Sequence, residues 1–117
     1  MELKVFLAEL IAGLGLLDFV VSMDVRTEAF TVKGRIDLQE QGFLETYFNE
    51  KTQTLAIAWI ADGQRKWGID RDNLRGWHRH PLQNPDEHQP MPAANIRDIL
   101  IEFAEAWRQA QSSARDV

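Results

Sequence analysis

Every histidine of the chain lies in the stretch LRGWHRHPLQNPDEHQP, which runs from Leu74 to Pro90. Histidine both takes up and gives up a proton near neutral pH, so two of them can divide the roles of general base and general acid. Metal-free cleavage of RNA needs that division: one group takes the 2′-hydroxyl proton and the other protonates the leaving oxygen. We therefore predict His78 and His80 as the proton-transfer pair and His88 as a third catalytic residue.

The segment that leads into the histidines carries a local surplus of positive charge. Its five basic residues outnumber its two acidic ones, Asp70 and Asp72; the basic residues are Arg65, Lys66, Arg71, Arg75 and Arg79. An arginine at this place would hold a phosphate and stabilise the charge that develops on it. Trp77 would either stack on an unpaired base or anchor the segment to the core. We predict Arg71, Arg75, Trp77 and Arg79 as substrate-binding residues, although a solvated charged hairpin would show the same charge pattern.

Two other interpretations fit the same histidines. In an extended segment His78 and His80 point to one face, which also suits two ligands of one zinc or other divalent ion. His88 or a carboxylate would complete that site, and the candidate carboxylates are Asp70, Asp72, Asp86 and Glu87. However, H-x-H is common and no third ligand follows at a fixed spacing. We therefore predict no metal or other cofactor, and name the three histidines as the ligands if a metal is bound. In the third interpretation the protein is a non-enzymatic interaction module whose acidic body and exposed sheet edge dock a partner.

Composition narrows the protein class. A chain of 117 residues is long enough for one domain with a real core, and we treat residues 1–117 as a single domain. The absence of cysteine excludes disulfides, thiolate ligands and a cysteine nucleophile. A net charge of −5 argues against a protein that coats nucleic acid, though not against a local RNA site. The sequence has neither a glycine-rich phosphate loop nor a G-x-S-x-G elbow.

The N-terminal stretch VFLAELIAGLGLLDFVVSM is apolar enough to suggest a signal peptide or a membrane span. Glu9 and Asp18 interrupt it, and no basic region precedes it, so it does not fit a signal peptide or a membrane span. We predict a core-packing segment, no membrane partner and a cytoplasmic protein.

Hydrophobic periodicity predicts an α+β fold in the order α-β-β-β-β-α. Leucines at four-three spacing indicate a helix over 1–14, and the β-branched FVVSMDV after it reads as the start of a strand. A four-stranded antiparallel meander is expected over 28–71, with strands at 28–38, 43–49, 54–61 and 64–70 and a tight turn at Asp62-Gly63. Trp59 and Trp67 are assigned to the core of this sheet.

After the sheet, four prolines predict an irregular histidine and proline loop over 73–92. Asn95 followed by Asp98 resembles a helix start, and a helix with Trp107 on its apolar face is expected over 95–110. QSSARDV should be a frayed polar tail. The helices should flank the sheet, and the oligomeric state, including a homodimer, stays open.

The arrangement resembles the TumE-type toxin family of prokaryotic toxin–antitoxin pairs over roughly residues 3–107. The matching features are VKGRIDLQEQGFLETYFN, LAIAWIADGQRKWGIDRDN with its Asp72-Asn73 element, and the His-Pro segment WHRHPLQNPDEHQP, although the family typically has adjacent His-His pairs. The resemblance implies a small toxin that cleaves RNA and is neutralised by a helix-turn-helix antitoxin. It adds Asp72 and Asn73 to the predicted substrate-binding residues and supports His78, His80 and His88 as the catalytic ones.

Overall fold

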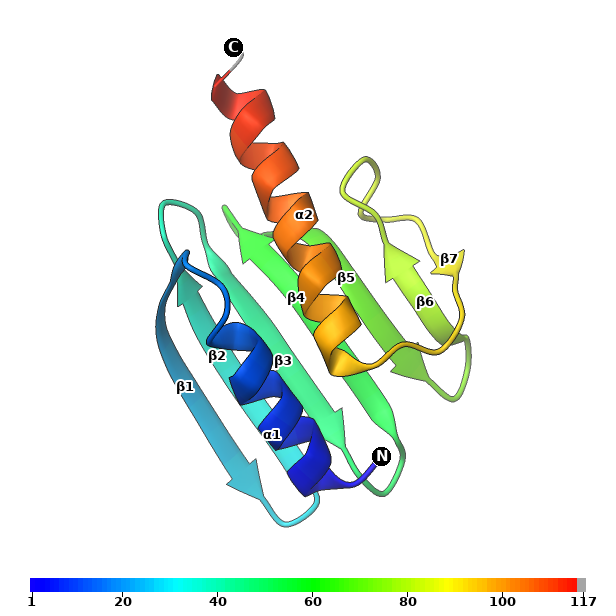
Figure 1. Ribbon diagram of the computed structural model, residues 1–117. Helices are drawn as coiled ribbons and strands as arrows, with labels where there is room; N and C mark the ends of the chain where they lie inside the picture. The colour runs from blue at the N-terminus through cyan, green and yellow to red at the C-terminus, as the bar shows by residue number, and fades with distance from the viewer. Residues whose placement is uncertain (116–117) are drawn as a thin grey trace.

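The computed structural model describes residues 1–115, which form two helices and one seven-stranded antiparallel sheet. The strands pair in chain order from β1 to β7, as Figure 1 shows. The elements are α1 (Leu3–Leu14), β1 (Val20–Glu28), β2 (Thr31–Leu38), β3 (Phe43–Asn49), β4 (Thr54–Ala61), β5 (Gln64–Asp72), β6 (Gly76–His80), β7 (Gln89–Pro90) and α2 (Ile96–Arg115). The predicted α+β class with terminal helices and an antiparallel sheet is confirmed, but the prediction of four strands is wrong.

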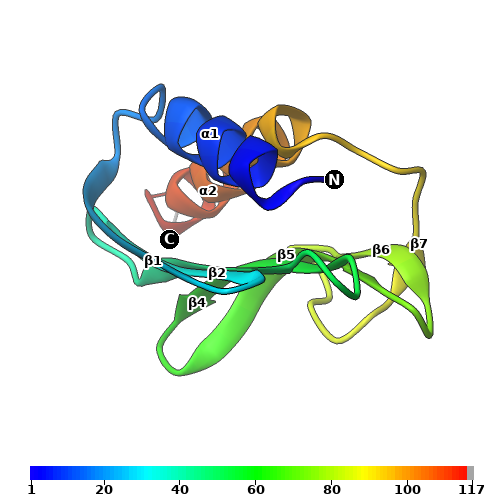
Figure 2. The same ribbon diagram turned by 90° about the horizontal axis from the view of Figure 1, so that it is seen from below.

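Both helices lie on the same face of the sheet, and within residues 1–115 no helix covers the other face (Figure 2). Phe6 of α1 stacks on Phe48 of β3 with ring centroids 4.7 Å apart, and Phe103 of α2 packs against Trp59 and Trp67. The two helices approach closely at Gly13, where a Cβ atom would come within 2.5 Å of Leu100 Cδ1. The core therefore fills the space between the helix layer and one sheet face.

Tryptophans and the N-terminal segment behave as predicted. Trp59 and Trp67 are buried in the core, and Trp107 packs against it with its ring stacked on Phe19 at 4.0 Å. Helix α1 buries Phe6, Leu10 and Leu14 in the same core, which confirms its assignment as a core-packing helix. Among residues 1–115, neither helix is both long enough and apolar enough to cross a lipid bilayer.

The first strand of the predicted meander divides into two. A single strand over 28–38 is wrong, because the chain reverses at Ala29 and Phe30 between β1 and β2. Ala29 adopts a φ of +49° there, a conformation that glycine or asparagine usually takes, so no typical turn residue marks this reversal. The interpretation of FVVSMDV as the start of a strand is confirmed by β1.

The predicted loop over 73–92 contains two further strands. Irregular structure is wrong for Gly76–His80, which forms β6, and for Gln89–Pro90, which forms β7. None of the four prolines lies inside β6, and Pro90 lies in the edge strand, where a missing backbone N–H is tolerated. The turn into β6 is held by Asp72, whose Oδ1 accepts hydrogen bonds from the backbone N–H of Leu74 and Arg75.

Helix α2 begins where predicted and ends later. Asn95 Oδ1 accepts a hydrogen bond from the Asp98 N–H at 2.8 Å, which confirms the expected cap. The helix continues beyond residue 110 to Arg115, because QSSAR contains neither glycine nor proline to end it. The remaining two residues of the predicted tail lie outside the described residues.

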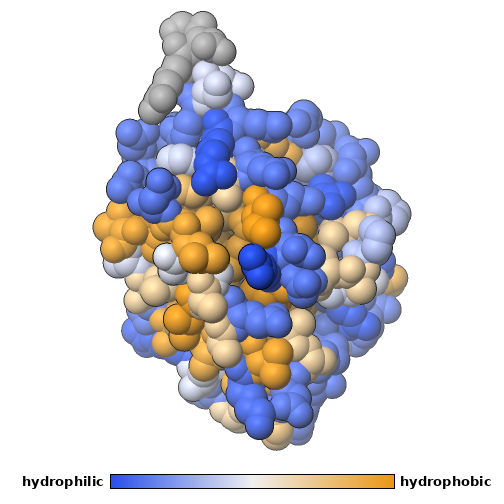
Figure 3. Space-filling model, in the orientation of Figure 1, coloured by the Kyte–Doolittle hydropathy of each residue, from blue (hydrophilic) through white to orange (hydrophobic). Residues whose placement is uncertain are grey.

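The helix layer carries apolar side chains at its surface, which Figure 3 shows around α1. The most exposed of these are Val5, Ile11, Leu16 and Ile101. The opposite, open face of the sheet is the one on which the histidines gather.

Candidate functional site

Strand β6 sends alternate side chains to the two faces of the sheet. Arg79 points to the helix layer, where its guanidinium donates to both carboxylate oxygens of Glu102 on α2 at 2.8 and 2.6 Å. Trp77 packs against the core on the same side. Since side chains alternate along a strand, His78 and His80 face the open side of the sheet. Strand β6 is thus anchored to the helix layer through Arg79 and Trp77, and its two imidazoles lie on the opposite, open face of the sheet.

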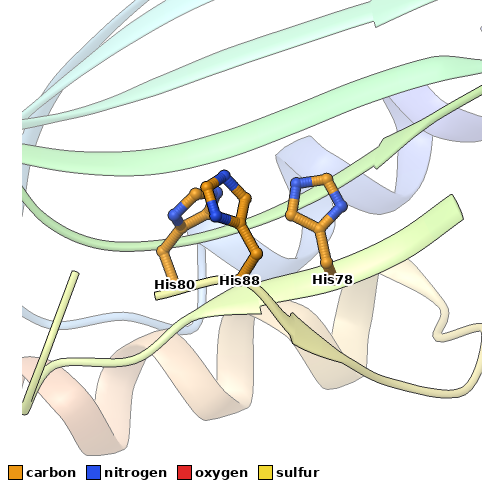
Figure 4. A group of neighbouring side chains, drawn as sticks. All are labelled: His78, His80 and His88. Atoms are coloured by element: carbon orange, nitrogen blue, oxygen red, sulfur yellow. The ribbon is translucent and has the colours of Figure 1, made fainter. Parts of the chain in front are cut away.

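The segment between β6 and β7 folds back under the open face of the sheet and covers part of it (Figure 2), on the side where these imidazoles lie. It brings His88 beside them, with its ring centroid 4.6 Å from that of His80 and 5.5 Å from that of His78. His78 and His80 are 3% and 6% exposed, whereas His88 is open to solvent. One ring nitrogen of each histidine lies within 4.8 Å of the others (Figure 4). We call these three residues the histidine cluster.

A carboxylate completes the cluster from the neighbouring strand. Asp70 of β5 is the cross-strand partner of His78, so its side chain shares the open face. Its Oδ2 atom lies 3.1 Å from His80 Nε2 and 3.6 Å from His78 Nε2. Arg65 holds the same carboxylate through two parallel hydrogen bonds of 3.1 Å. This fork fixes the orientation of Asp70 beneath the imidazoles.

The hydrogen bonds of the two buried imidazoles determine where their protons lie. His78 Nδ1 is 3.0 Å from the Gly76 carbonyl oxygen, and His80 Nδ1 is 2.9 Å from the Pro85 carbonyl oxygen. A carbonyl oxygen only accepts, so each Nδ1 carries the proton. In the neutral rings both Nε2 lone pairs then face Asp70 Oδ2, which is also an acceptor. Three acceptors that converge in this way need a cation between them, either an additional proton or a metal ion.

Glycine at position 68 makes room for the Arg65 side chain. A Cβ atom there would lie 3.2 Å from both Arg65 Cζ and Nε and 3.3 Å from the Ile57 carbonyl oxygen. The arginine therefore crosses above Gly68 on its way to Asp70. Ala58 and Gly68 precede His80 in one cross-strand row, and both of these small residues are buried.

His88 has the electrostatic surroundings of an uncharged imidazole. Its pKa is lowered first by desolvation and then by the positive charge of Arg75, with smaller contributions from His80 and His78. A lowered pKa means that His88 keeps a free lone pair to lower pH than an ordinary histidine. The uncharged ring is the form that binds a metal ion.

Most predicted substrate-binding residues take structural positions. Arg71 donates to the carbonyl oxygens of Thr52 and Gln53, and Asn73 donates to Thr52, so both hold the β3–β4 turn. The pKa of Asp72 is lowered chiefly by the hydrogen bond from the Arg75 N–H, in the turn that Asp72 stabilises. Trp77 and Arg79 lie on the other face of the sheet. Of the predicted set, Arg75 and Asp72 act on the cluster through their charges: Arg75 lowers the pKa of His88, and Asp72 interacts electrostatically with His78.

Two of the five cations in the predicted surplus are paired with carboxylates, Arg65 with Asp70 and Arg79 with Glu102, and part of the surplus lines a pocket next to the cluster. This pocket has a volume of about 530 Å³, and two cations, Arg65 and Lys66, lie on its wall. Pro85, whose carbonyl oxygen holds His80, belongs to the same wall. The other lining residues are Gln64, Leu82 and Asp86. The pocket is large enough for a small anionic group beside the imidazoles.

Sequence reasoning found the histidines and included Asp70 among the carboxylates, but missed Arg65. The signal that would have found Arg65 is the strand register. Once β6 is recognised, the short turn after Asp72 pairs Asp70 with His78 and Gly68 with His80. The bulge in β4–β5 pairing near Ile60 and Arg65 was not visible in the sequence.

Comparison with known proteins identifies no family for this chain. No protein-family model matches the chain, and neither a curated protein nor a solved structure does so. The likeness to TumE-type toxins therefore stays a prediction that depends on the quoted motifs alone.

Proposed function

We propose that the protein binds one divalent transition-metal ion of the zinc class through His78, His80 and His88, with Asp70 beside them. The convergence of two Nε2 lone pairs on one carboxylate oxygen carries this proposal. Each buried imidazole donates its Nδ1 proton to a backbone carbonyl, which is the usual way in which a protein orients a metal-binding histidine. Imidazole nitrogen with carboxylate oxygen is a donor set that zinc accepts.

The distances between the donor atoms suit a site that closes on the ion. A tetrahedral zinc centre with bonds of about 2.0–2.1 Å needs ligand atoms about 3.3 Å apart. His80 Nε2 and Asp70 Oδ2 are already close to that separation at 3.1 Å. The three histidine nitrogens spread to 4.8 Å, so one ring must turn inward. His88 is the exposed member, and its side chain has the freedom to do so.

The same geometry disfavours metal-free acid–base catalysis. That mechanism needs two imidazoles on either side of a reacting phosphate, each within hydrogen-bond reach of a different oxygen. His78 and His80 instead lie side by side, with ring centroids 5.2 Å apart, and both are buried against one carboxylate. This burial and proximity leave little room for a phosphate between them. The metal-binding alternative therefore fits these side chains better than the proton-transfer pair.

For the activity, we propose hydrolysis of a phosphodiester in RNA, which is what the resemblance to TumE-type toxins implies. A zinc ion bound there would supply a Lewis acid and an activated water. Arg65 and Lys66 in the adjacent pocket would hold the substrate phosphate. Farther along the open sheet face, Phe43 and Tyr47 line a pocket with Lys33 and Arg35, a combination that suits unpaired bases. A helix-turn-helix antitoxin is the proposed partner.

The metal proposal is tested by elemental analysis of tag-free protein purified without chelator and dialysed against zinc. We expect one zinc ion per wild-type chain and none above background in His80→Ala, because that variant loses a buried ligand. Asp86→Ala, an exposed carboxylate in the same loop, should keep the ion. Wild-type protein that retains no stoichiometric zinc, cobalt, nickel, manganese or iron would rule the proposal out.

The proposed activity has its own readout. Zinc-loaded wild type is expected to cleave single-stranded RNA, and both EDTA and His80→Ala should reduce the rate at least about 100-fold, as expected when a metal centre is lost. The control is Asp18→Ala, which removes an exposed carboxylate between α1 and β1 and should cleave at the wild-type rate. Cleavage that continues undiminished in EDTA would contradict a metal-dependent mechanism. If the zinc-loaded protein cleaves no RNA, RNA is not the substrate of this metal site.

A further inference from the structure

The two edges of the sheet differ in how far they are protected. Strand β7 is an edge of two residues, one of them Pro90, and the covering loop leads directly into it. Strand β1 has nine residues, contains no proline, and within residues 1–115 pairs only with β2. A long edge strand leaves a row of backbone N–H and C=O groups ready to pair with another strand. Of the two edges of the sheet, β1 is therefore the one that is available to pair with another strand.

The side chains of β1 divide between its two faces in a regular way. Met23, Val25 and Thr27 pair with residues of β2 that face the helix layer. Asp24 and Arg26 pair with Arg35 and Lys33, which lie on the open face. A negative and a positive side chain thus flank Val25 on the same face of the edge strand, where Arg26 Nε lies 3.3 Å from Asp24 Oδ1 of the same chain.

We propose that β1 pairs antiparallel with β1 of a second copy of this chain, about a two-fold axis at Val25. This register places Asp24 of each copy opposite Arg26 of the other, so two opposite-charge pairs form on the open face. On the helix face, Val25 meets Val25 and Met23 meets Thr27. The sheets of the two copies then join into one.

Neighbouring registers are less favourable. A slip by one residue would turn the side chains of one copy to the wrong face of the joint sheet. A two-fold axis at Asp24 or at Arg26 would keep the helix layers of both copies on the same side of the joint sheet. It would, however, place Asp24 opposite Asp24, or Arg26 opposite Arg26, and like charges directly opposite each other are destabilising. The proposed register also buries part of Val21 and Met23, which are 63% and 45% exposed in the single chain. Charge and burial therefore favour the same pairing.

The test is the mass of the full chain in solution, measured by sedimentation equilibrium over a range of concentrations. Wild type should dimerise. Asp24→Arg and Arg26→Asp should each weaken dimerisation roughly 10- to 100-fold, because each creates two like-charge contacts across the axis. An equimolar mixture of these two variants should dimerise again, because each then meets the opposite charge. The double variant Asp24→Arg/Arg26→Asp should behave like wild type.

Two controls separate this register from a general charge effect. Arg108→Asp changes the charge by the same amount as Arg26→Asp on the exposed side of α2, and should leave the dimer intact. Circular dichroism should show that every variant is folded, as expected for exposed side chains. A monomeric wild type, a dimer that survives both single variants, or a mixture that fails to recover would each overturn the proposal.

Discussion

Saturating zinc is expected to raise the midpoint of thermal unfolding of this protein by roughly 15 °C. A ligand that binds only the folded chain adds about 4 kcal/mol to the free energy of unfolding at a thousandfold excess over its Kd. In a domain of this size each kcal/mol corresponds to about 4 °C. Differential scanning fluorimetry with and without zinc measures the shift. EDTA should reverse it, and His80→Ala should show no shift at all.

The same measurement compares how much the two carboxylates of β5, Asp70 and Asp72, contribute to zinc binding. Asp70→Asn keeps the shape of the side chain but removes the charge that faces His78 and His80, and should weaken zinc binding about 10- to 100-fold. Asp72→Asn, two residues farther along the strand, removes an equal charge from a turn and should weaken zinc binding far less than Asp70→Asn, because Asp72 interacts with His78 only through space. An equal loss in both variants would mean that the effect is one of general charge, and magnesium acting as well as zinc would contradict the proposed donor set.

Gly42→Ala is expected to lower the free energy of unfolding by about 3–4 kcal/mol. Gly42 adopts a φ of +70° in the β2–β3 turn, and a Cβ atom there would lie 2.0 Å from the Ile60 carbonyl oxygen. The backbone of β4 cannot move away without disturbing Trp59, whose Nε1 donates to the Gln41 carbonyl oxygen in the same turn.

The control for this prediction is Gly63→Ala. Gly63 has nearly the same φ, +71°, but nothing within 4 Å of the added methyl group. It should cost about 1 kcal/mol of backbone strain alone. Urea unfolding of the two variants therefore separates steric conflict from conformational strain, and equal losses would show that the close approach to Ile60 is not a constraint.

The sequence predicted the central elements of the fold because their patterns are strong and local. Alternation in β2 and β3, the apolar run of β4, the Asp62-Gly63 turn and the helical face of α2 all lie where they were expected. The edges of the sheet were missed for two different reasons. Ala29 turns the chain without a turn residue, and a proline-rich context concealed β6, although no proline lies within it.

The candidate site was predicted in its residues but not in its geometry. Residue types alone identified the three histidines, and H-x-H spacing placed His78 and His80 on one face if that segment was extended. The contribution of Arg65 depends on a bulge and on the absence of a side chain at Gly68, which are tertiary properties. The basic residues looked like a phosphate site in the sequence, yet Arg71 and Arg79 are used to hold a turn and a helix.

The fastening of β6 to α2 determines how a metal ion would enter and leave. His78 and His80 are held by a strand that Arg79 and Trp77 tie to the rest of the protein, so their positions are set before any ion arrives. Only His88 lies on the covering segment, and the conformational entropy lost on binding falls mainly on that segment. Exchange kinetics would then follow the opening rate of residues 81–88 rather than the unfolding of the sheet. A protein built in this way can hold an ion tightly at equilibrium and still release it quickly.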